Sequence, residues 1–124
     1  MTTGLLLAGL ALLQLKHFVA DFLLQPTYVY SNKGNYGHPG GLIHTGLHML
    51  GTVPVLMLLG MGPLAIALVV VAEGIVHYHL DFAKDRIGTR LNIQITQWRY
   101  WALFGLDQVL HQMTYVAILW VAAL

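Results

Sequence analysis

Four long runs of mostly apolar residues alternate with shorter polar segments along the chain. Each run is long enough to cross a bilayer as a helix, which takes about 20 consecutive apolar residues. We therefore expect an all-α fold, an integral membrane bundle of four transmembrane helices that forms one domain over residues 1–124. The four predicted spans cover about residues 2–25, 41–60, 63–84 and 98–123.

The breaks between the runs agree with these boundaries. Pro26 should end the first helix, because proline cannot continue a helical hydrogen-bond ladder. Residues 26–41 are rich in Gly, Asn, Tyr and Pro, which is typical of an interfacial loop. The sequence GMGP at 60–63 predicts a tight connection between two spans. Residues 85–97 are polar, and we expect them on the membrane surface as a short strand or an amphipathic segment.

Composition separates this chain from soluble domains. Hydrophobic residues make up 57% of it and charged residues 9%, against about 25% charged residues in ordinary globular proteins. The formal net charge of +1 and the lack of a basic patch give no reason to expect nucleic-acid binding. There is no cysteine, so disulfides and thiolate metal sites are excluded.

The positive charges predict an orientation in the membrane. Five of the six lysine and arginine residues fall in or beside the two longer loops: Lys33, Lys84, Arg86, Arg90 and Arg99. The turn at 60–63 and both chain ends carry no charged side chain. Because lysine and arginine are enriched in cytoplasmic loops, we expect both long loops in the cytoplasm and both termini on the outer side.

The two halves of the chain share a polar motif. HFVADF at 17–22 and HYHLDF at 77–82 have the same His-x-x-x-Asp-Phe spacing, and each closes an apolar run. The next helix of each half carries a further pair four residues apart: His44 with His48, then Asp107 with His111. This pattern predicts two tandem helical hairpins related by an axis along the membrane normal, although convergence on one site would give the same spacing.

Histidines and acids lie within the apolar runs at helical spacing. Residues four apart share one helix face, and an isolated charge in mid-membrane costs about 2.5–3.5 kcal/mol, so these side chains should face the bundle interior. Counted along each span, Glu73 and His111 fall near the midplane and the others in the half of the membrane next to the long loops, which predicts one polar cavity there. The set is His17, Asp21, His44, His48, Glu73, His77, Asp81, Asp107 and His111.

Imidazole and carboxylate are the usual ligands of zinc, iron and manganese. We therefore predict that these nine residues form a divalent metal site. Their four carboxylates would balance the charge of two ions, so a dinuclear site is one form of the prediction. A metal ion with an open position can activate water, which makes a metal-dependent hydrolase the simplest catalytic hypothesis.

The same residues leave other interpretations open. An interhelical network of hydrogen bonds and ion pairs would satisfy them without a metal. Histidines on facing helices can also ligate haem or a chlorophyll-type pigment. A chain this small can serve as a non-catalytic accessory subunit of a larger membrane complex, or form a homo-oligomer. His38 and His79 fall outside the pattern and are expected at the interface, and Lys16 is expected to line a neighbouring groove or to snorkel.

The order of these motifs resembles a bacterial membrane-protein family, domain of unknown function 3307. The resemblance rests on H-x-x-x-D-F-x-x-Q at 17–25, H-x-x-x-D-x-x-K at 77–84 and D-Q-x-x-H at 107–111, with Lys33 and His44 between them. It implies a small multi-pass protein of the bacterial inner membrane, and it supplies no activity. It also adds candidate cofactor-binding residues, which are Gln25, Lys33, Lys84 and Gln108. A looser likeness to inner-membrane metal-dependent hydrolases rests on residue type alone.

Overall fold

The computed structural model describes residues 1–124, and all of its regular structure is helical. The expected all-α fold is confirmed, and the alternative of a short strand in 85–97 is wrong. The helix that begins at Pro63 continues to Arg90, past the predicted end of its span at residue 84. Only residues 91–97 therefore separate it from the next helix. The elements are α1 (Thr3–Phe18), the π-helical turn η1 (Val19–Leu23), α2 (Thr27–Tyr30), α3 (Pro39–Leu58), α4 (Pro63–Arg90) and α5 (Trp98–Ala123).

Local sequence explains where these helices begin and end. Pro39 and Pro63 open α3 and α4, where a missing N–H costs no hydrogen bond. Pro26 follows η1 and starts α2, so the predicted end of the first helix is confirmed. The His38 side chain accepts a hydrogen bond from the Gly40 backbone N–H at 3.0 Å, which caps α3 and keeps His38 out of the interior.

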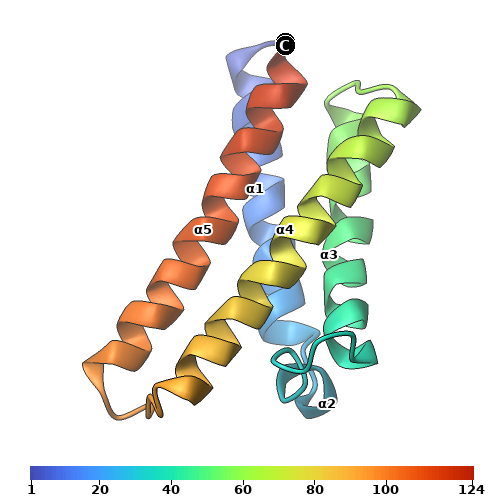
Figure 1. The fold of residues 1–124 in the computed structure, drawn as a ribbon. Helices are drawn as coiled ribbons and strands as arrows, with labels where there is room; N and C mark the ends of the chain where they lie inside the picture. Colours follow the sequence, from blue (N-terminus) through green and yellow to red (C-terminus); the bar gives the residue numbers. More distant parts are fainter.

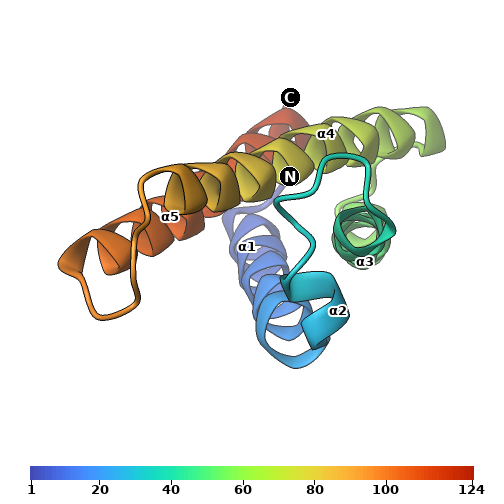
Figure 2. The same cartoon turned by 60° about the horizontal axis from the view of Figure 1, so that its bottom comes forward.

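The four long helices run roughly along one direction (Figure 1). α3 packs against α4, α4 against α5, and α1 against both α3 and α5. Viewed from below, α4 and α5 lie side by side, with α1 and α3 on one side of them (Figure 2). The chain ends and the α3–α4 connection lie at one end, whereas α2 and the α4–α5 loop lie at the other (Figure 1). We call the second end the loop end.

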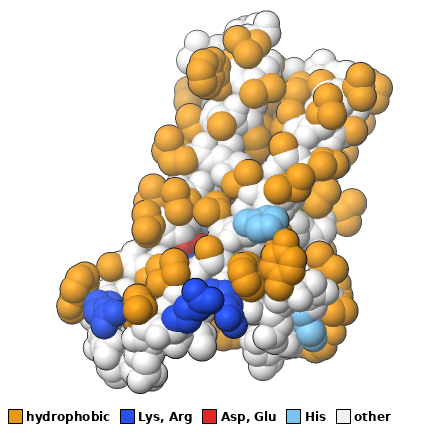
Figure 3. Space-filling model, viewed as in Figure 1, with side chains coloured by type: hydrophobic (Ala, Val, Ile, Leu, Met, Phe, Trp, Pro, Cys, Tyr) orange, Lys and Arg blue, Asp and Glu red, His pale blue; other side chains and the backbone are white.

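Three of these helices are long and apolar enough to cross a membrane: Thr3–Leu23, α3 and α4. Large apolar side chains cover their outer faces, which Figure 3 shows for one side of the molecule. α5 carries Asp107, Gln108, His111 and Gln112 in its middle, and its crossing stays a prediction.

The interior changes character along the helices. Its apolar core gathers near the chain ends, around Leu13 on α1, Leu56 on α3 and Tyr115 on α5. Nearer the loop end, the buried side chains are histidines, acids and lysines. The structure therefore confirms that the buried polar side chains concentrate in one half of the helices, as predicted.

Candidate metal centre

Asp21 lies where three histidines from two helices meet. It sits on η1, and π-helical turns of this kind occur frequently at functional sites. Its Oδ1 atom is 2.9 Å from Nε2 of His48 and 3.1 Å from Nε2 of His44. Its Oδ2 atom is 3.2 Å from Nε2 of His17. One carboxylate thus joins α1 to α3 through imidazole groups.

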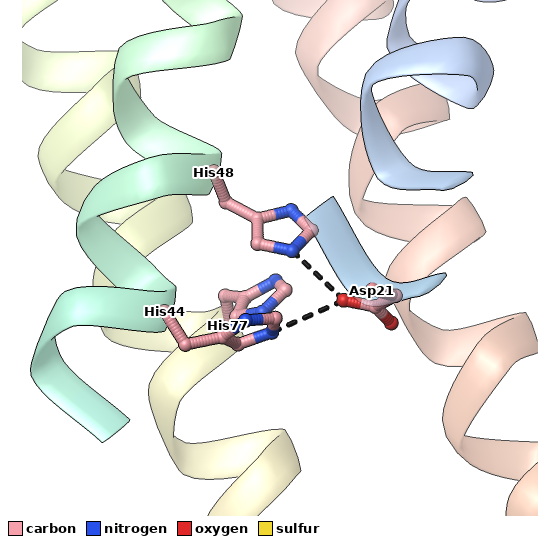
Figure 4. Close-up of side chains that lie close together, drawn as sticks. All are labelled: Asp21, His44, His48 and His77. Carbon is pink, nitrogen blue, oxygen red and sulfur yellow. Dashed lines mark hydrogen bonds and ion pairs between the residues drawn. The ribbon is translucent and has the colours of Figure 1, made fainter. Parts of the chain in front are cut away.

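His77 completes a compact group with Asp21, His44 and His48. Each of these four residues offers one ligand atom, and the four atoms lie within 4.8 Å of one another. Figure 4 shows the two α3 histidines joined to the Asp21 carboxylate by dashed lines, with His77 of α4 close to them. The rings of His48 and His77 are 3.9 Å apart between centroids. The spacing of four on α3 turns both of its histidines to the same side.

A second group shares His77 with the first. It consists of His77, Asp81 and His111, whose ligand atoms also lie within 4.8 Å of one another. Asp81 Oδ2 is 3.4 Å from His77 Nε2, and Asp81 Oδ1 is 3.9 Å from His111 Nε2. The Nδ1 atom of His111 lies 2.8 Å from the Asp107 carbonyl oxygen. That contact leaves Nε2 of His111 free to act as a ligand.

Several buried ligand atoms have no hydrogen-bond partner. Among the nine predicted ligands, these atoms are Nδ1 of His44, Oε2 of Glu73, Nε2 of His77, Oδ1 of Asp107 and Nε2 of His111. A buried polar atom without a partner costs about 1–3 kcal/mol, and native proteins contain few of them. His44, His77 and His111 belong to the two groups around Asp21 and Asp81, where a bound cation would give buried ligand atoms a partner.

The surroundings of His44 give the same indication. Lys33 Nζ lies 2.9 Å from Nε2 of His44 and can only donate a hydrogen bond. The ionised carboxylates of Asp21 and Asp81 lie 3.1 and 3.3 Å from the same nitrogen and can only accept. One nitrogen cannot accept from the lysine and donate to the acids together. Coordination of a cation would resolve this conflict, because the lone pair of Nε2 would then bind the cation and the carboxylates would face the same positive charge.

Two lysines enter the interior beside this centre. Lys33 Nζ is 3.0 Å from Asp81 Oδ2. Lys16 Nζ is 2.7 Å from Glu73 Oε1 and 3.1 Å from Thr52 Oγ1. The sequence pattern did not place Lys16 in the site. The signal available was its charge within an apolar span, which calls for a buried acid on a neighbouring helix.

The nine predicted ligands separate into two sets. Six of them make up the two groups, which share His77: Asp21, His44, His48, His77, Asp81 and His111. The other three border the groups without joining them. His17 contacts Asp21 and also lies 2.8 Å from the Tyr115 hydroxyl, Asp107 supports His111, and Glu73 pairs with Lys16.

The residues added by the family resemblance lie around one cavity of about 220 Å³ on the loop-end side of the centre. Gln25 Nε2 donates to the Asp21 carbonyl oxygen at 2.6 Å, and Gln108 Oε1 is 3.0 Å from Nε2 of His17. Lys33 reaches Asp81, whereas Lys84 lies 3.4 Å from Asp85. His79 is exposed on α4, and its Nε2 atom is 3.1 Å from the Tyr36 hydroxyl.

Comparison with known proteins gives one match. The family described as "protein of unknown function (DUF3307)" matches residues 10–124. No curated protein and no solved structure matches the chain. The matched range includes every residue of both groups. An activity therefore has to be inferred from the residues themselves.

Proposed function

Because the chain belongs to the DUF3307 family, whose function is unknown, we propose from its own residues that it is a membrane protein built around one divalent metal ion. The observation that carries the proposal is the buried group of Asp21, His44, His48 and His77. Three imidazoles and a carboxylate match the ligand number and types that zinc takes, and iron and manganese accept the same ligands.

The geometry of this group suits a single ion. Ligand atoms of a tetrahedral zinc site lie roughly 3.3 Å apart, because each is about 2.0–2.1 Å from the metal. The four ligand atoms here already lie within 4.8 Å of one another. Small side-chain rotations would close the group around an ion, and Asp21 lies on the π-helical turn η1, which contacts α3.

Charge balance favours one ion over the two that the sequence suggested. Four buried carboxylates face the interior: Asp21, Glu73, Asp81 and Asp107. Lys16 neutralises Glu73 and Lys33 neutralises Asp81, with nitrogen–oxygen distances of 2.7 and 3.0 Å. Two negative charges remain, which equal the charge of one divalent cation. Uncompensated charge in the membrane interior is costly, so the second ion loses its electrostatic basis.

Hydrolysis is the chemistry we propose for this centre. A divalent ion held by these four ligands would activate water and polarise a substrate oxygen when it accepts a fifth ligand, an expansion that zinc sites make and that larger coordination numbers of iron and manganese allow. The cavity of about 220 Å³ reaches Asp21 and Asp81, so water and a small group have access to the ligands from the loop end. The cavity is thus the feature that supports an enzyme over a purely structural network.

We also propose four membrane crossings, with α5 as the fourth. α5 spans 26 residues beside α4, and its polar residues Asp107 and His111 are buried. Lysine and arginine side chains gather at the loop end, which supports placing this end in the cytoplasm and both termini outside (Figure 3). The family resemblance favours the bacterial inner membrane. Asp21 and Asp81 both approach His44, which supports the tandem-hairpin relationship.

Elemental analysis of the detergent-purified protein tests the metal proposal. We expect about one equivalent of zinc, iron or manganese in the wild type and its loss in His77→Ala. His79→Ala is the matched control, because His79 is two residues away on α4 and exposed. Circular dichroism would check that both variants stay helical. A metal-free wild-type protein after growth in metal-replete medium would overturn the proposal.

The other interpretations predict different results. A haem or pigment would need space between its axial histidines, whereas the rings of His48 and His77 lie 3.9 Å apart. A visible absorption spectrum of the purified protein tests this directly. An accessory-subunit role, or a homo-oligomer, would appear as stoichiometric partners or a larger mass in mild detergent.

A further inference from the structure

The cavity beside the metal centre continues toward the surface of the loop end. The inner cavity has a volume of about 220 Å³ and is bordered by Asp21 and Asp81. A second cavity of about 350 Å³ lies outside it, between the segment after α2 and the α4–α5 hairpin. The two cavities share four lining residues, which are Tyr30, Lys84, Tyr100 and Phe104. The two cavities therefore adjoin at these side chains, and together they form what we call the passage, from the loop-end surface to the carboxylates of the centre.

Lys84 is the cation best placed to hold a ligand in this passage. It lines both cavities, and its only ion pair is to Asp85, the next residue, at 3.4 Å. Lys33 also lines the inner cavity, but its ammonium group is held by Asp81 and His44. The two side chains are partly buried, 18% and 25% exposed, but their separation exceeds the about 2.7–2.9 Å of a charge-assisted hydrogen bond, so Lys84 can exchange Asp85 for an anionic ligand.

The walls of the passage suit the head of an amphiphile. Phe22 and Phe104 provide apolar surface, and Tyr30 and Tyr100 provide hydroxyl groups. Phe22 is itself 54% exposed on the outer face, where lipid would contact it. Arg86 adds a second positive side chain in the outer cavity. Cations and aromatic side chains at this level are typical of membrane–water interfaces.

Binding of an anion here depends on the metal ion. Asp21, Asp81 and Asp107 all line the inner cavity, against the two positive charges of Lys33 and Lys84. Without an ion, the carboxylates would repel an anion from the inner cavity. With a divalent ion on Asp21, the formal charge of the same lining changes from −1 to +1. The inner cavity would then attract an anion between the ion and Lys84.

We propose that this passage binds a phosphate group, carried by a lipid headgroup or as a free phosphate ester, between the metal ion and Lys84. Lysine binds phosphate as a point charge, and a bound divalent ion is the strongest local charge for phosphate oxygens. This inference rests on the proposed metal centre. It names the substrate class of that centre and the residue that holds the anionic group.

Isothermal titration calorimetry of the zinc-loaded protein in a neutral detergent tests the inference. The probes are inorganic phosphate, dioctanoyl phosphatidic acid and dioctanoylglycerol, which lacks phosphate. We expect phosphatidic acid or phosphate to bind, about tenfold more weakly in Lys84→Gln, and dioctanoylglycerol not to bind. The matched control is Arg90→Gln, because Arg90 is exposed on α4 and lines neither cavity. Zinc content is measured on every sample.

The outcomes separate this inference from the proposal beneath it. Binding of phosphatidic acid alone identifies a lipid headgroup, and binding of inorganic phosphate identifies a soluble source. A protein that retains zinc but binds neither anion, or binds them equally well in Lys84→Gln, overturns the inference and leaves the metal centre standing. Equal binding of dioctanoylglycerol also overturns it. A wild-type protein that takes up no zinc overturns both.

Discussion

The ammonium group of Lys16 on α1 lies 2.7 Å from a carboxylate oxygen of Glu73 on α4, and the two side chains are only 8% and 1% exposed. Thr52 donates a further hydrogen bond to the same oxygen at 3.0 Å. A carboxylate that is neutralised in this way has little charge to offer a metal ion. The pair therefore explains why Glu73, at ligand spacing in the sequence, stays outside the group around Asp21.

Glu73→Gln should destabilise the protein without removing its metal. Loss of one partner leaves the Lys16 charge buried and unpaired, which costs about 3–5 kcal/mol in comparable cases. The double variant Lys16→Met with Glu73→Leu should recover most of this stability, because neither charge remains. Thermal unfolding in detergent, followed by circular dichroism, measures both effects. Loss of zinc in the single and double variants alike would instead identify Glu73 as a ligand.

Gly51→Ala should displace Lys16 and lower stability. A Cβ atom at Gly51 would lie 2.6 Å from Cγ of Lys16, so the lysine stem would have to move away from Glu73. Overpacking of this kind costs about 1–3 kcal/mol. Gly46→Ala on the same helix is the control, since a Cβ there meets nothing within 4 Å. Equal melting temperatures for the two variants would show that Lys16 does not need the space at Gly51.

The helical class and the helix positions could be predicted from the sequence because both depend on local pattern. The apolar runs located all four long helices, and the prolines marked where helices start. The end of α4 was placed six residues early, at 84 rather than 90. Residues 85–90 are polar, so hydropathy excluded them from the span, but nothing in them breaks a helix.

The site was predictable only as far as single helices determine it. Spacing of four correctly grouped His44 with His48, and His77 with Asp81, on common faces. Which residues meet across helices depends on the rotation of each helix about its axis, and periodicity does not contain that information. Lys16 is one residue from His17 yet reaches a different partner. Tyr115 lies four residues after His111, on the same helix face, but that spacing does not indicate which helix its hydroxyl contacts, and the structure places it against His17 on α1.

Acid should release the metal. A histidine must be neutral to ligate, so ion binding competes with protonation and weakens as the pH falls. Three of the four proposed ligands are histidines: His44, His48 and His77. We expect one equivalent of zinc to be retained during dialysis at about pH 7.5. Most of it should be lost at about pH 5, which is below the ordinary pKa of a histidine side chain. Metal content before and after dialysis measures this. Retention of zinc at both pH values would argue against histidine ligands.

Lys33→Met should tighten zinc binding. The ammonium group of Lys33 lies 3.0 Å from Asp81 and 2.9 Å from Nε2 of His44, so it competes with a metal ion for both. Two unit charges about 4 Å apart interact by about 4 kcal/mol near a protein surface, and removal of one cation should lower the dissociation constant roughly tenfold or more. Competition with a chromophoric chelator measures the constant. Removal of the lysine also leaves three uncompensated carboxylates where two remained, but His77 offers one ligand atom and belongs to both groups, so the zinc content should stay at one equivalent. Arg90→Gln removes one positive charge from an exposed position and should change neither the dissociation constant nor the zinc content.

If Lys33→Met instead bound zinc more weakly, Lys33 would be holding Asp81 and His44 in position for the ion, and the competition inferred from these distances would be wrong.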